Sequence, residues 1–199
     1  LMDVFRKQAQ RFGAKTHFKE VTKVELNKAR EYKVYLNDEV FIAESIIIAT
    51  GASARLLNLK KESELMGYGV SACATCDAFF YKDKEVLVVG GGDSAMEEAT
   101  YLTKFASKVT IIHRKKSFRA SQIMQDRVYQ NKKINIIWDT VVKDLHGDPK
   151  DEGLKAVILK NTKTGKELEY KCDGLFLAIG HIPNSQLFKD QLDLDPSNY

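Results

Sequence analysis

One turn constrains the fold of this chain more than any other stretch. Val86–Val89 is an apolar, mostly β-branched run, which predicts a buried strand. It leads through the turn Gly90-Gly-Gly-Asp-Ser-Ala95 into a segment whose pattern predicts a helix. A strand, a Gly-x-Gly-x-x-Ala turn and a helix in this order form the fingerprint of a dinucleotide-binding unit. Gly90 allows the tight turn, Gly92 lets the backbone approach a pyrophosphate, and Ala95 permits close packing. The alternative is a glycine-rich turn that binds no ligand.

Positive charge follows the next predicted strand, Lys108–Ile112. That strand runs into His113-Arg114-Lys115, and Arg119 comes shortly after. A unit that binds NAD carries Asp or Glu about 20 residues after the first glycine, to bond the ribose hydroxyls. Guanidinium groups at this place suit a 2′-phosphate instead. The sequence therefore predicts NADPH rather than NADH, and the alternative is a solvated basic loop.

A Cys-x-x-Cys pair, Cys73 and Cys76, precedes the glycine turn and is followed at once by Asp77. A zinc site would need a second such pair or suitably spaced histidines, and the only other cysteine is the distant Cys172. We therefore expect no metal. A purely structural disulfide would close too short a loop to stabilise the chain much. A redox-active dithiol remains, in which Asp77 exchanges protons with a leaving thiolate or, alternatively, caps a helix or turn.

Composition excludes several other classes of protein. The 199 residues are 44% hydrophobic, enough for one or two compact domains, and the net charge of +4 is too mild to indicate nucleic acid. No apolar run is long enough to span a membrane and no signal peptide is present. Three cysteines, two of them at redox spacing, suit a reducing compartment such as the cytoplasm. An organelle stays open, because the first residues of the gene product are expected to be missing.

The predicted elements on either side of the glycine turn indicate two units. Before it we expect a helix at 1–12 and strands at 17–26, 31–36, 39–43 and 46–49, the last of them buried. After it we expect a helix at 121–132, a strand at 134–138, antiparallel strands at 140–145, 154–161 and 166–171, and a closing buried strand at 174–179. Crossings between the units are expected near 58–69 and 180–184, where Gly67, Gly69 and Gly180 would allow rotation.

Four motifs together resemble one family. They are the stretches around Cys73–Asp77, Gly90–Ala95, His113–Arg119 and Ala178–Asn184, in that order. They resemble the low-molecular-weight NADPH-dependent thioredoxin reductases, and the resemblance covers essentially the whole chain. Two residues depart from the family pattern: Ala78 stands where the family usually has glycine, and Lys115 stands where it has a second arginine.

The resemblance implies a fold class and a domain order. The fold is α/β, with a three-layer, Rossmann-like NADPH domain that carries an antiparallel β insertion and is itself inserted into a partial FAD domain. Residues 1–66 and 182–199 would belong to the FAD domain and 67–181 to the NADPH domain. The family's N-terminal Gly-x-Gly-x-x-Gly is absent from the sequence. We therefore expect an internal piece of a longer flavoprotein, inactive by itself.

The resemblance also implies a function, thioredoxin-disulfide reductase. Electrons would pass from NADPH through FAD to the Cys73–Cys76 pair and on to thioredoxin. The resemblance also implies a homodimer. Cys76 would lie nearest the flavin, Cys73 would attack the substrate, and Asp77 would be the acid and base. The cofactor-binding residues carried over are Gly90, Gly91, Gly92, Asp93, Ser94, Ala95, His113, Arg114, Lys115, Arg119, Ile179 and Gly180 for NADPH, and Val21, Thr50 and Gly51 for FAD.

Two other functions stay open at this point. One is a related flavin-dependent dithiol reductase that serves another protein, such as a peroxiredoxin-reducing flavoprotein. The other is a nucleotide-binding module without catalysis. Val21 also has a plain alternative, because an apolar residue in a predicted strand is most simply part of a core.

Overall fold

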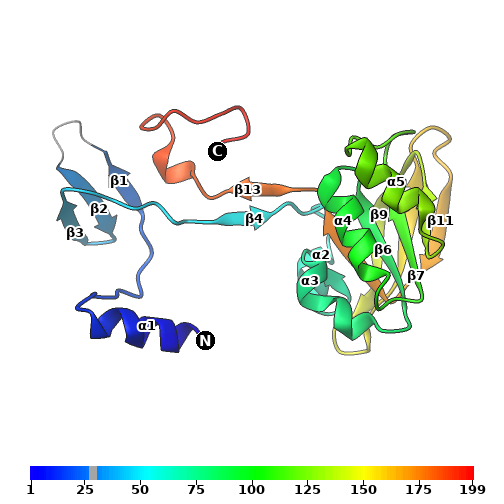
Figure 1. Ribbon diagram of the computed structural model, residues 1–199, viewed down its shortest axis with the longest axis horizontal. Helices are drawn as coiled ribbons and strands as arrows, with labels where there is room; N and C mark the ends of the chain where they lie inside the picture. Colours follow the sequence, from blue (N-terminus) through cyan, green and yellow to red (C-terminus); the bar gives the residue numbers. More distant parts are fainter. Residues whose placement is uncertain (27–30) are drawn as a thin grey trace. The chain divides into compact units, whose positions relative to one another are not determined.

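The chain folds into two compact units in a computed structural model that describes residues 1–26 and 31–199 (Figure 1). The larger unit is Ser53–Ile182, and the smaller unit combines Leu1–Ala52 with Pro183–Tyr199. The Cys-x-x-Cys pair and the glycine turn both belong to the larger unit.

A parallel sheet of five strands forms the middle of the larger unit. Its order is β5 (Val70–Ser71), β12 (Gly174–Ala178), β6 (Glu85–Gly90), β7 (Lys108–Ile112) and β8 (Ile134–Ile137). Phe176 pairs with Val88, and Val88 pairs with Ile111. All five residues of β12 are buried, as expected for a central strand that is covered on both faces.

Helices cover one face of this sheet. They are α3 (Ala74–Asp77), the 3₁₀ helix η1 (Ala78–Tyr81), α4 (Asp93–Leu102) and α5 (Gln122–Gln130). In α4 the residues Met96, Ala99 and Leu102 recur every third position and are fully buried, so they form the stripe that faces the sheet. They pack with Val88 and Phe176 in one apolar core.

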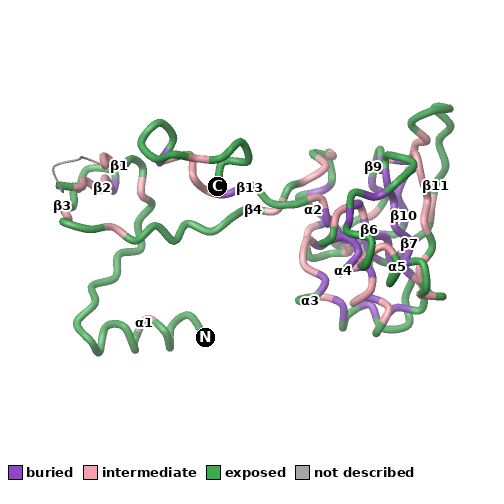
Figure 2. Tube along the Cα trace, turned by 45° about the horizontal axis from the view of Figure 1, so that its top comes forward, coloured by how far each residue is buried: buried purple, intermediate pink, exposed green. Residues whose placement is uncertain are grey.

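A second sheet covers the other face. It is antiparallel, in the order β11 (Glu167–Lys171), β10 (Gly153–Asn161) and β9 (Thr140–Asp148). Its inward side chains Leu145 and Val157 pack on Leu87 and Leu175 of the parallel sheet, and Figure 2 shows the buried strands of both sheets in purple. The predicted three-layer, Rossmann-like unit with an antiparallel insertion is therefore confirmed.

The segment expected to cross between the units at 58–69 lies within the larger unit instead. Leu65 is fully buried in its core, in the short helix α2 (Glu62–Leu65). The buried carboxylate of Glu62 accepts hydrogen bonds from the Leu57 and Leu59 amides, at 2.7 and 3.2 Å. An added Cβ on Gly69 would lie 2.4 Å from the Leu154 Cβ, so Gly69 is needed for close packing. The predicted crossing at 58–69 is wrong.

The chain changes units at two short strands that pair with each other. These are β4 (Ala52–Ala54) and β13 (His181–Pro183). Beside them, the Arg55 amide donates to the Gly180 carbonyl at 2.9 Å. The assignment of one cofactor to each unit stays a prediction.

The smaller unit contains the helix α1 (Met2–Arg11), the 3₁₀ helix η2 (Gln186–Phe188) and an antiparallel sheet. The sheet order is β1 (Lys23–Glu25), β2 (Tyr32–Leu36) and β3 (Glu39–Ala43). The strands predicted at 31–36 and 39–43 agree with β2 and β3. The strand predicted at 17–26 is limited to Lys23–Glu25, and residues 17–22, Val21 among them, have no regular structure. The side chain of Gln191 bonds both the Leu26 amide and the Val24 carbonyl, at 2.8 and 3.1 Å. This contact joins the C-terminal segment to β1.

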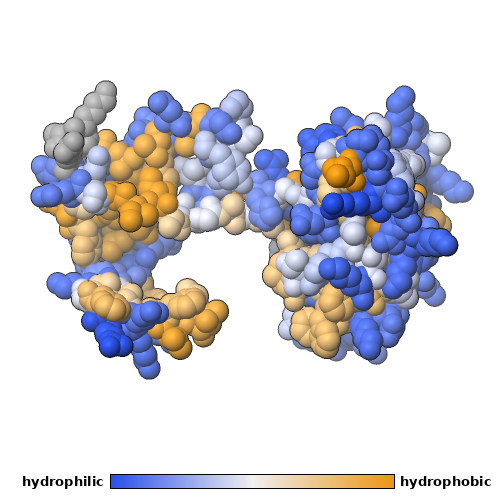
Figure 3. All heavy atoms as spheres, in the orientation of Figure 1, coloured by the Kyte–Doolittle hydropathy of each residue, from blue (hydrophilic) through white to orange (hydrophobic). Residues whose placement is uncertain are grey.

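The buried strand predicted at 46–49 is wrong. These residues have no regular structure, and Ile47 is 93% exposed. A buried strand needs hydrogen-bonded neighbours and a cover, and no strand in the described part of the chain lies beside it. The helix α1 likewise has no buried residue. Figure 3 shows the apolar side chains that remain on the surface of this unit.

Candidate functional site

The predicted NADPH-binding and redox motifs of the larger unit leave its parallel sheet at one edge. Ser71 ends β5, Gly90 ends β6, Ile112 ends β7 and Ala178 ends β12. Because these strands are parallel, their carboxyl ends lie at the same edge, which is where open α/β sheets bind ligands. The Cys-x-x-Cys loop, the glycine turn, the basic loop and Ile179-Gly180 thus emerge together.

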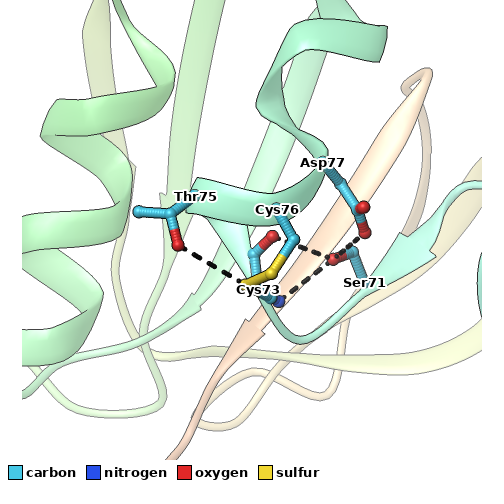
Figure 4. Close-up of a disulfide and its surroundings, with 5 residues drawn as sticks. All are labelled: Ser71, Cys73, Thr75, Cys76 and Asp77. Carbon is cyan, nitrogen blue, oxygen red and sulfur yellow. Dashed lines mark hydrogen bonds between the residues drawn. A yellow bond between two sulfur atoms is a disulfide. The ribbon is translucent and has the colours of Figure 1, made fainter. Parts of the chain in front are cut away.

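Cys73 and Cys76 form a disulfide at the start of α3, with their Cα atoms 5.3 Å apart (Figure 4). Cys76 is exposed and Cys73 is half-buried. The Thr75 hydroxyl lies 3.5 Å from the Cys73 sulfur. The predicted dithiol pair is therefore joined as a reducible bond on the surface of the unit.

The carboxylate of Asp77 lies beside the same turn. Its Oδ2 accepts a hydrogen bond from the Ser71 hydroxyl at 2.7 Å, and that hydroxyl accepts one from the Cys73 amide at 3.0 Å (Figure 4). Asp77 stands at the N-cap of η1 but makes no side-chain capping bond. The capping alternative is thus not what the structure shows.

Ser71 is a site residue that the sequence reasoning missed. A signal was present, because a serine hydroxyl commonly bonds the amide two residues further on. What the sequence could not show is that the hydroxyl also meets Asp77, six positions away.

The glycine turn has one closed side and one open side. An added Cβ on Gly90 would lie 2.4 Å from the Ala178 carbonyl oxygen and 2.6 Å from the Ala95 Cβ. Gly92 has no atom within 4 Å of an added Cβ, and no side chain caps the N-terminus of α4 there. Gly92 therefore faces free space in front of a helix N-terminus, which suits an incoming phosphate.

Gly91 ties this turn to the basic loop. Its carbonyl accepts hydrogen bonds from the Arg119 and Ala120 amides, at 2.7 and 3.1 Å. An added Cβ on Gly91 would lie 2.2–2.3 Å from atoms of the His113 ring. The position therefore requires glycine, and the main chain of the loop is fixed against the turn.

His113 points inward rather than toward a ligand. It is 7% exposed and lies among Gly91, Phe118 and Trp138, with ring centroids 5.4 and 5.9 Å away for the two aromatic residues. Its Nε2 lies 3.0 Å from the Ser117 carbonyl oxygen. Burial lowers its pKa below the ordinary value. His113 thus supports the turn from behind.

The charged side chains of the loop point to solvent. Arg114, Lys115 and Arg119 are exposed, and none of them is ion-paired with an acidic side chain of the described residues. Asp93 is engaged elsewhere, because its Oδ1 accepts bonds from the Ser121 amide and hydroxyl at 2.8 and 2.7 Å. These bonds lower the pKa of Asp93. Three free cations beside the turn suit an additional phosphate.

Three of the remaining predicted site residues belong to the larger unit and three belong to the smaller unit. Ser94 is exposed in the first turn of α4, Ile179 is half-buried, and Gly180 is exposed with φ +99°. In the smaller unit Val21 is half-buried, and Thr50 and Gly51 are exposed. The Thr50 carbonyl accepts a hydrogen bond from the Asn184 side-chain amide at 3.0 Å, and the Gly51 carbonyl accepts one from the Asn184 main-chain amide at 3.0 Å.

A second carboxylate, Glu98, lies under the redox turn. It belongs to α4, and its Oε2 is buried without a hydrogen-bond partner among the described residues. Burial raises its pKa to about 7, although a bond from the Ala74 amide at the start of α3 opposes the shift. Glu98 therefore links the glycine-turn helix to the redox turn and changes charge near neutral pH.

No three His, Cys, Asp or Glu side chains in residues 1–26 and 31–199 gather so that they could hold a metal ion. Across the same residues, the helices are all too short or too polar to cross a membrane.

Comparisons with known proteins agree with this arrangement. A family model described as pyridine nucleotide-disulphide oxidoreductase matches residues 4–199. Proteins named thioredoxin reductase from Rickettsia felis and Streptomyces coelicolor are each 48% identical over the whole chain. The chain spans 64% and 61% of their lengths. The solved structure of thioredoxin reductase from Giardia duodenalis superposes with a TM-score of 0.83 at 40% identity, over 100% of this chain and 64% of that one.

The two faces of the glycine turn predict different effects of one added methyl group. Gly91→Ala should lower the free energy of unfolding by about 1–3 kcal/mol, because the methyl overlaps the His113 ring. Gly92→Ala should cost less than about 1 kcal/mol, yet it should weaken pyridine nucleotide binding by filling the open space. Denaturant unfolding followed by Trp138 fluorescence, and calorimetric titration with NADPH, measure the two effects. Equal destabilisation by both variants would contradict this assignment.

The raised pKa of Glu98 predicts a stability that depends on pH. Because the folded state keeps this proton up to about pH 7 and the unfolded state loses it near 4.5, wild-type stability falls as pH rises between those values. The variant Glu98→Gln should lack this loss. After allowance for solvent screening, its advantage over wild type should grow by about 1–2 kcal/mol from pH 4.5 to pH 8.

Unfolding by denaturant at a series of pH values tests this prediction. Glu64→Gln is the control, since it removes the same charge from an exposed position of the same unit. Glu97 is unsuitable, because its charge contributes to the raised pKa of Glu98. A difference between Glu98→Gln and wild type that stays constant with pH would show that Glu98 does not titrate in this range.

Proposed function

Because the chain belongs to the pyridine nucleotide-disulphide oxidoreductase family, we propose that the protein containing it is a thioredoxin-disulfide reductase that uses NADPH and FAD. The observation that carries this proposal is the Cys73–Cys76 disulfide, with Asp77 beside it, at the same sheet edge as the glycine turn. Relatives named thioredoxin reductase at 48% identity support the choice of substrate.

The larger unit fits NADPH. Gly92 leaves open space before α4 for the pyrophosphate, and Arg114, Lys115 and Arg119 offer free positive charge for the 2′-phosphate. Lys115 presents a point charge rather than a planar fork, so the two arginines would carry most of the preference for NADPH over NADH. Ser94, Ile179 and Gly180 would line the same nucleotide.

FAD would belong to the smaller unit, near Val21, Thr50 and Gly51. This part of the proposal rests mainly on the family and the resemblance, since the Thr50 and Gly51 carbonyls are already bonded to Asn184. When bound, the two cofactors would supply the hydride and pass two electrons to the disulfide. The chain's own residues would then perform the thiol chemistry.

The dithiol would reduce its substrate in two exchanges. The Cys73 thiolate would attack the substrate disulfide and bond to one sulfur, and the other sulfur would leave as a thiolate that takes a proton from Asp77. Asp77 would then remove the proton of the Cys76 thiol. The Cys76 thiolate would attack the Cys73 sulfur, restore the disulfide and release the second substrate thiolate, protonated in turn by Asp77. Two electrons and two protons would pass to the substrate.

Exposed apolar side chains beside this site could contact a protein substrate. Phe79 and Phe80 follow Asp77 directly, and each is 70% exposed. Exposed neighbouring aromatic side chains are typical of protein-binding surfaces. The proposed partner is thioredoxin, and the proposed assembly and compartment are a homodimer in the cytoplasm, as expected for a dithiol kept in a reducing environment.

The choice of nucleotide predicts a selective loss. Arg114→Ala and Arg119→Ala should each remove a charge-assisted phosphate contact of roughly 1.5–3 kcal/mol, which raises the KM for NADPH by about tenfold or more. The KM for NADH should change by less than about twofold. Steady-state kinetics of the enzyme with both nucleotides measure this.

The control for that experiment is Lys171→Ala. Lys171 lies with Glu85 and Asp173 near the opposite ends of the parallel strands, so its removal changes net charge without touching the turn. If the KM values for NADPH and NADH rose equally in the two arginine variants, the assignment of Arg114 and Arg119 to the 2′-phosphate would be wrong.

Cysteine variants test the proposed function, because the roles of the thiols predict which step of the reaction each variant loses. Cys73→Ser and Cys76→Ser should each abolish thioredoxin reduction, while NADPH still bleaches the flavin. Cys172→Ser should retain activity, because that thiol is 6% exposed and burial raises its pKa to about 12. A folded Cys172→Ser enzyme that cannot turn over, or a Cys73→Ser enzyme that can, would refute the proposal.

A further inference from the structure

Ser71 lies at the centre of the redox turn, and the reaction described above gives it no role. It is 3% exposed, at the end of β5. Its hydroxyl oxygen lies 2.7 Å from Asp77 Oδ2, 3.0 Å from the Cys73 amide nitrogen and 3.4 Å from the Cys73 carbonyl oxygen (Figure 4). A buried hydroxyl is costly unless it is bonded, and this one meets both ends of the redox motif.

The three contacts fix what the hydroxyl does when Asp77 is ionised. The Cys73 amide can only donate, so the Ser71 oxygen accepts from it. The single hydroxyl proton then goes to the Asp77 carboxylate, since 2.7 Å to a charged acceptor is stronger than 3.4 Å to a carbonyl. One lone pair of the Ser71 oxygen is left over.

The same contacts serve Asp77 when it is protonated. Its carboxyl group can then donate into the remaining lone pair of Ser71, and the Ser71 proton can turn to the Cys73 carbonyl. A hydroxyl can donate to the carboxylate and can accept from the O–H of the carboxylic acid, whereas an amide N–H or a lysine ammonium can only donate. Asp77 thus keeps its partner on both sides of a proton transfer.

We propose that Ser71 is a positioning residue that holds the Asp77 carboxyl group against the main chain of Cys73 in both of its protonation states, so that Asp77 can deliver a proton to a leaving thiolate. This inference rests on the proposed function, which makes Asp77 the acid. The proposed role explains why a polar side chain, Ser71, lies buried at the end of β5.

The proposal predicts an effect that depends on the leaving group. A basic alkyl thiolate leaves a disulfide more readily when a proton is supplied, whereas a weakly basic aromatic thiolate leaves without one. The dithiol of this chain, reduced beforehand, transfers two electrons and two protons to a small disulfide and becomes Cys73–Cys76 again. Hydroxyethyl disulfide and 5,5′-dithiobis(2-nitrobenzoate) are therefore matched probes that need no nucleotide, flavin or thioredoxin.

The experiment measures the rate of reoxidation of the full chain by each probe in rapid mixing. Ser71→Ala should slow the reaction with hydroxyethyl disulfide about tenfold and the reaction with the aromatic disulfide less than about twofold. Ser71→Thr and Ser71→Val form a second pair of equal size, in which only Thr keeps the hydroxyl. Thr should retain the wild-type ratio of the two rates and Val should lose it.

A double variant separates a positioning role from a structural one. If Ser71 acts through Asp77, Ser71→Ala should cause no further loss in an Asp77→Asn background. Equal slowing with both probes, an undiminished effect in that background, or identical Thr and Val variants would each overturn the proposal. A wild-type enzyme that fails to reduce thioredoxin, while its dithiol shows the predicted probe dependence, would instead refute the proposed function alone.

Discussion

The site depends on close packing around two of three consecutive glycines. Gly90 lies against the Ala178 carbonyl and Ala95, and Gly91 lies against the ring of His113. The Gly91 carbonyl also accepts two amides of the following loop. These main-chain bonds fix the backbone at Arg119 beside the turn. The side chains of Arg114, Lys115 and Arg119 are exposed, and no acidic side chain of the described residues is ion-paired with them. Their charge stays available for a ligand.

Much of the larger unit could be predicted because its signals are local. The strand Lys108–Ile112 was predicted with its observed bounds, since an apolar β-branched run between polar residues marks a buried strand. The same rule failed at 46–49, because an apolar run cannot show whether another strand lies beside it. The prediction that Gly69 allows rotation between the units failed for a similar reason. A glycine can indicate either a flexible backbone or close packing, and the sequence does not show that Leu154 packs against this one.

The candidate site divides in the same way. The spacing of Cys73, Cys76 and Asp77 is a property of neighbouring residues, and it led to the redox turn. The inward position of His113 and the contact between Ser71 and Asp77 are set by burial and by the path of the chain, which a motif does not contain. The reacting groups could therefore be identified from the sequence, whereas the groups that hold them in place could not.

The packing behind the glycine turn also gives the chain a natural optical probe. Trp138 is the only tryptophan, and its ring centroid lies 4.4 Å from that of Phe118 and 5.9 Å from that of His113. A displacement of the His113 ring, which packs against Gly91, should therefore change the fluorescence of Trp138 through these ring contacts. Its emission also overlaps the absorption of a reduced nicotinamide. Occupancy of the turn can thus be followed by light from the protein itself, without a label.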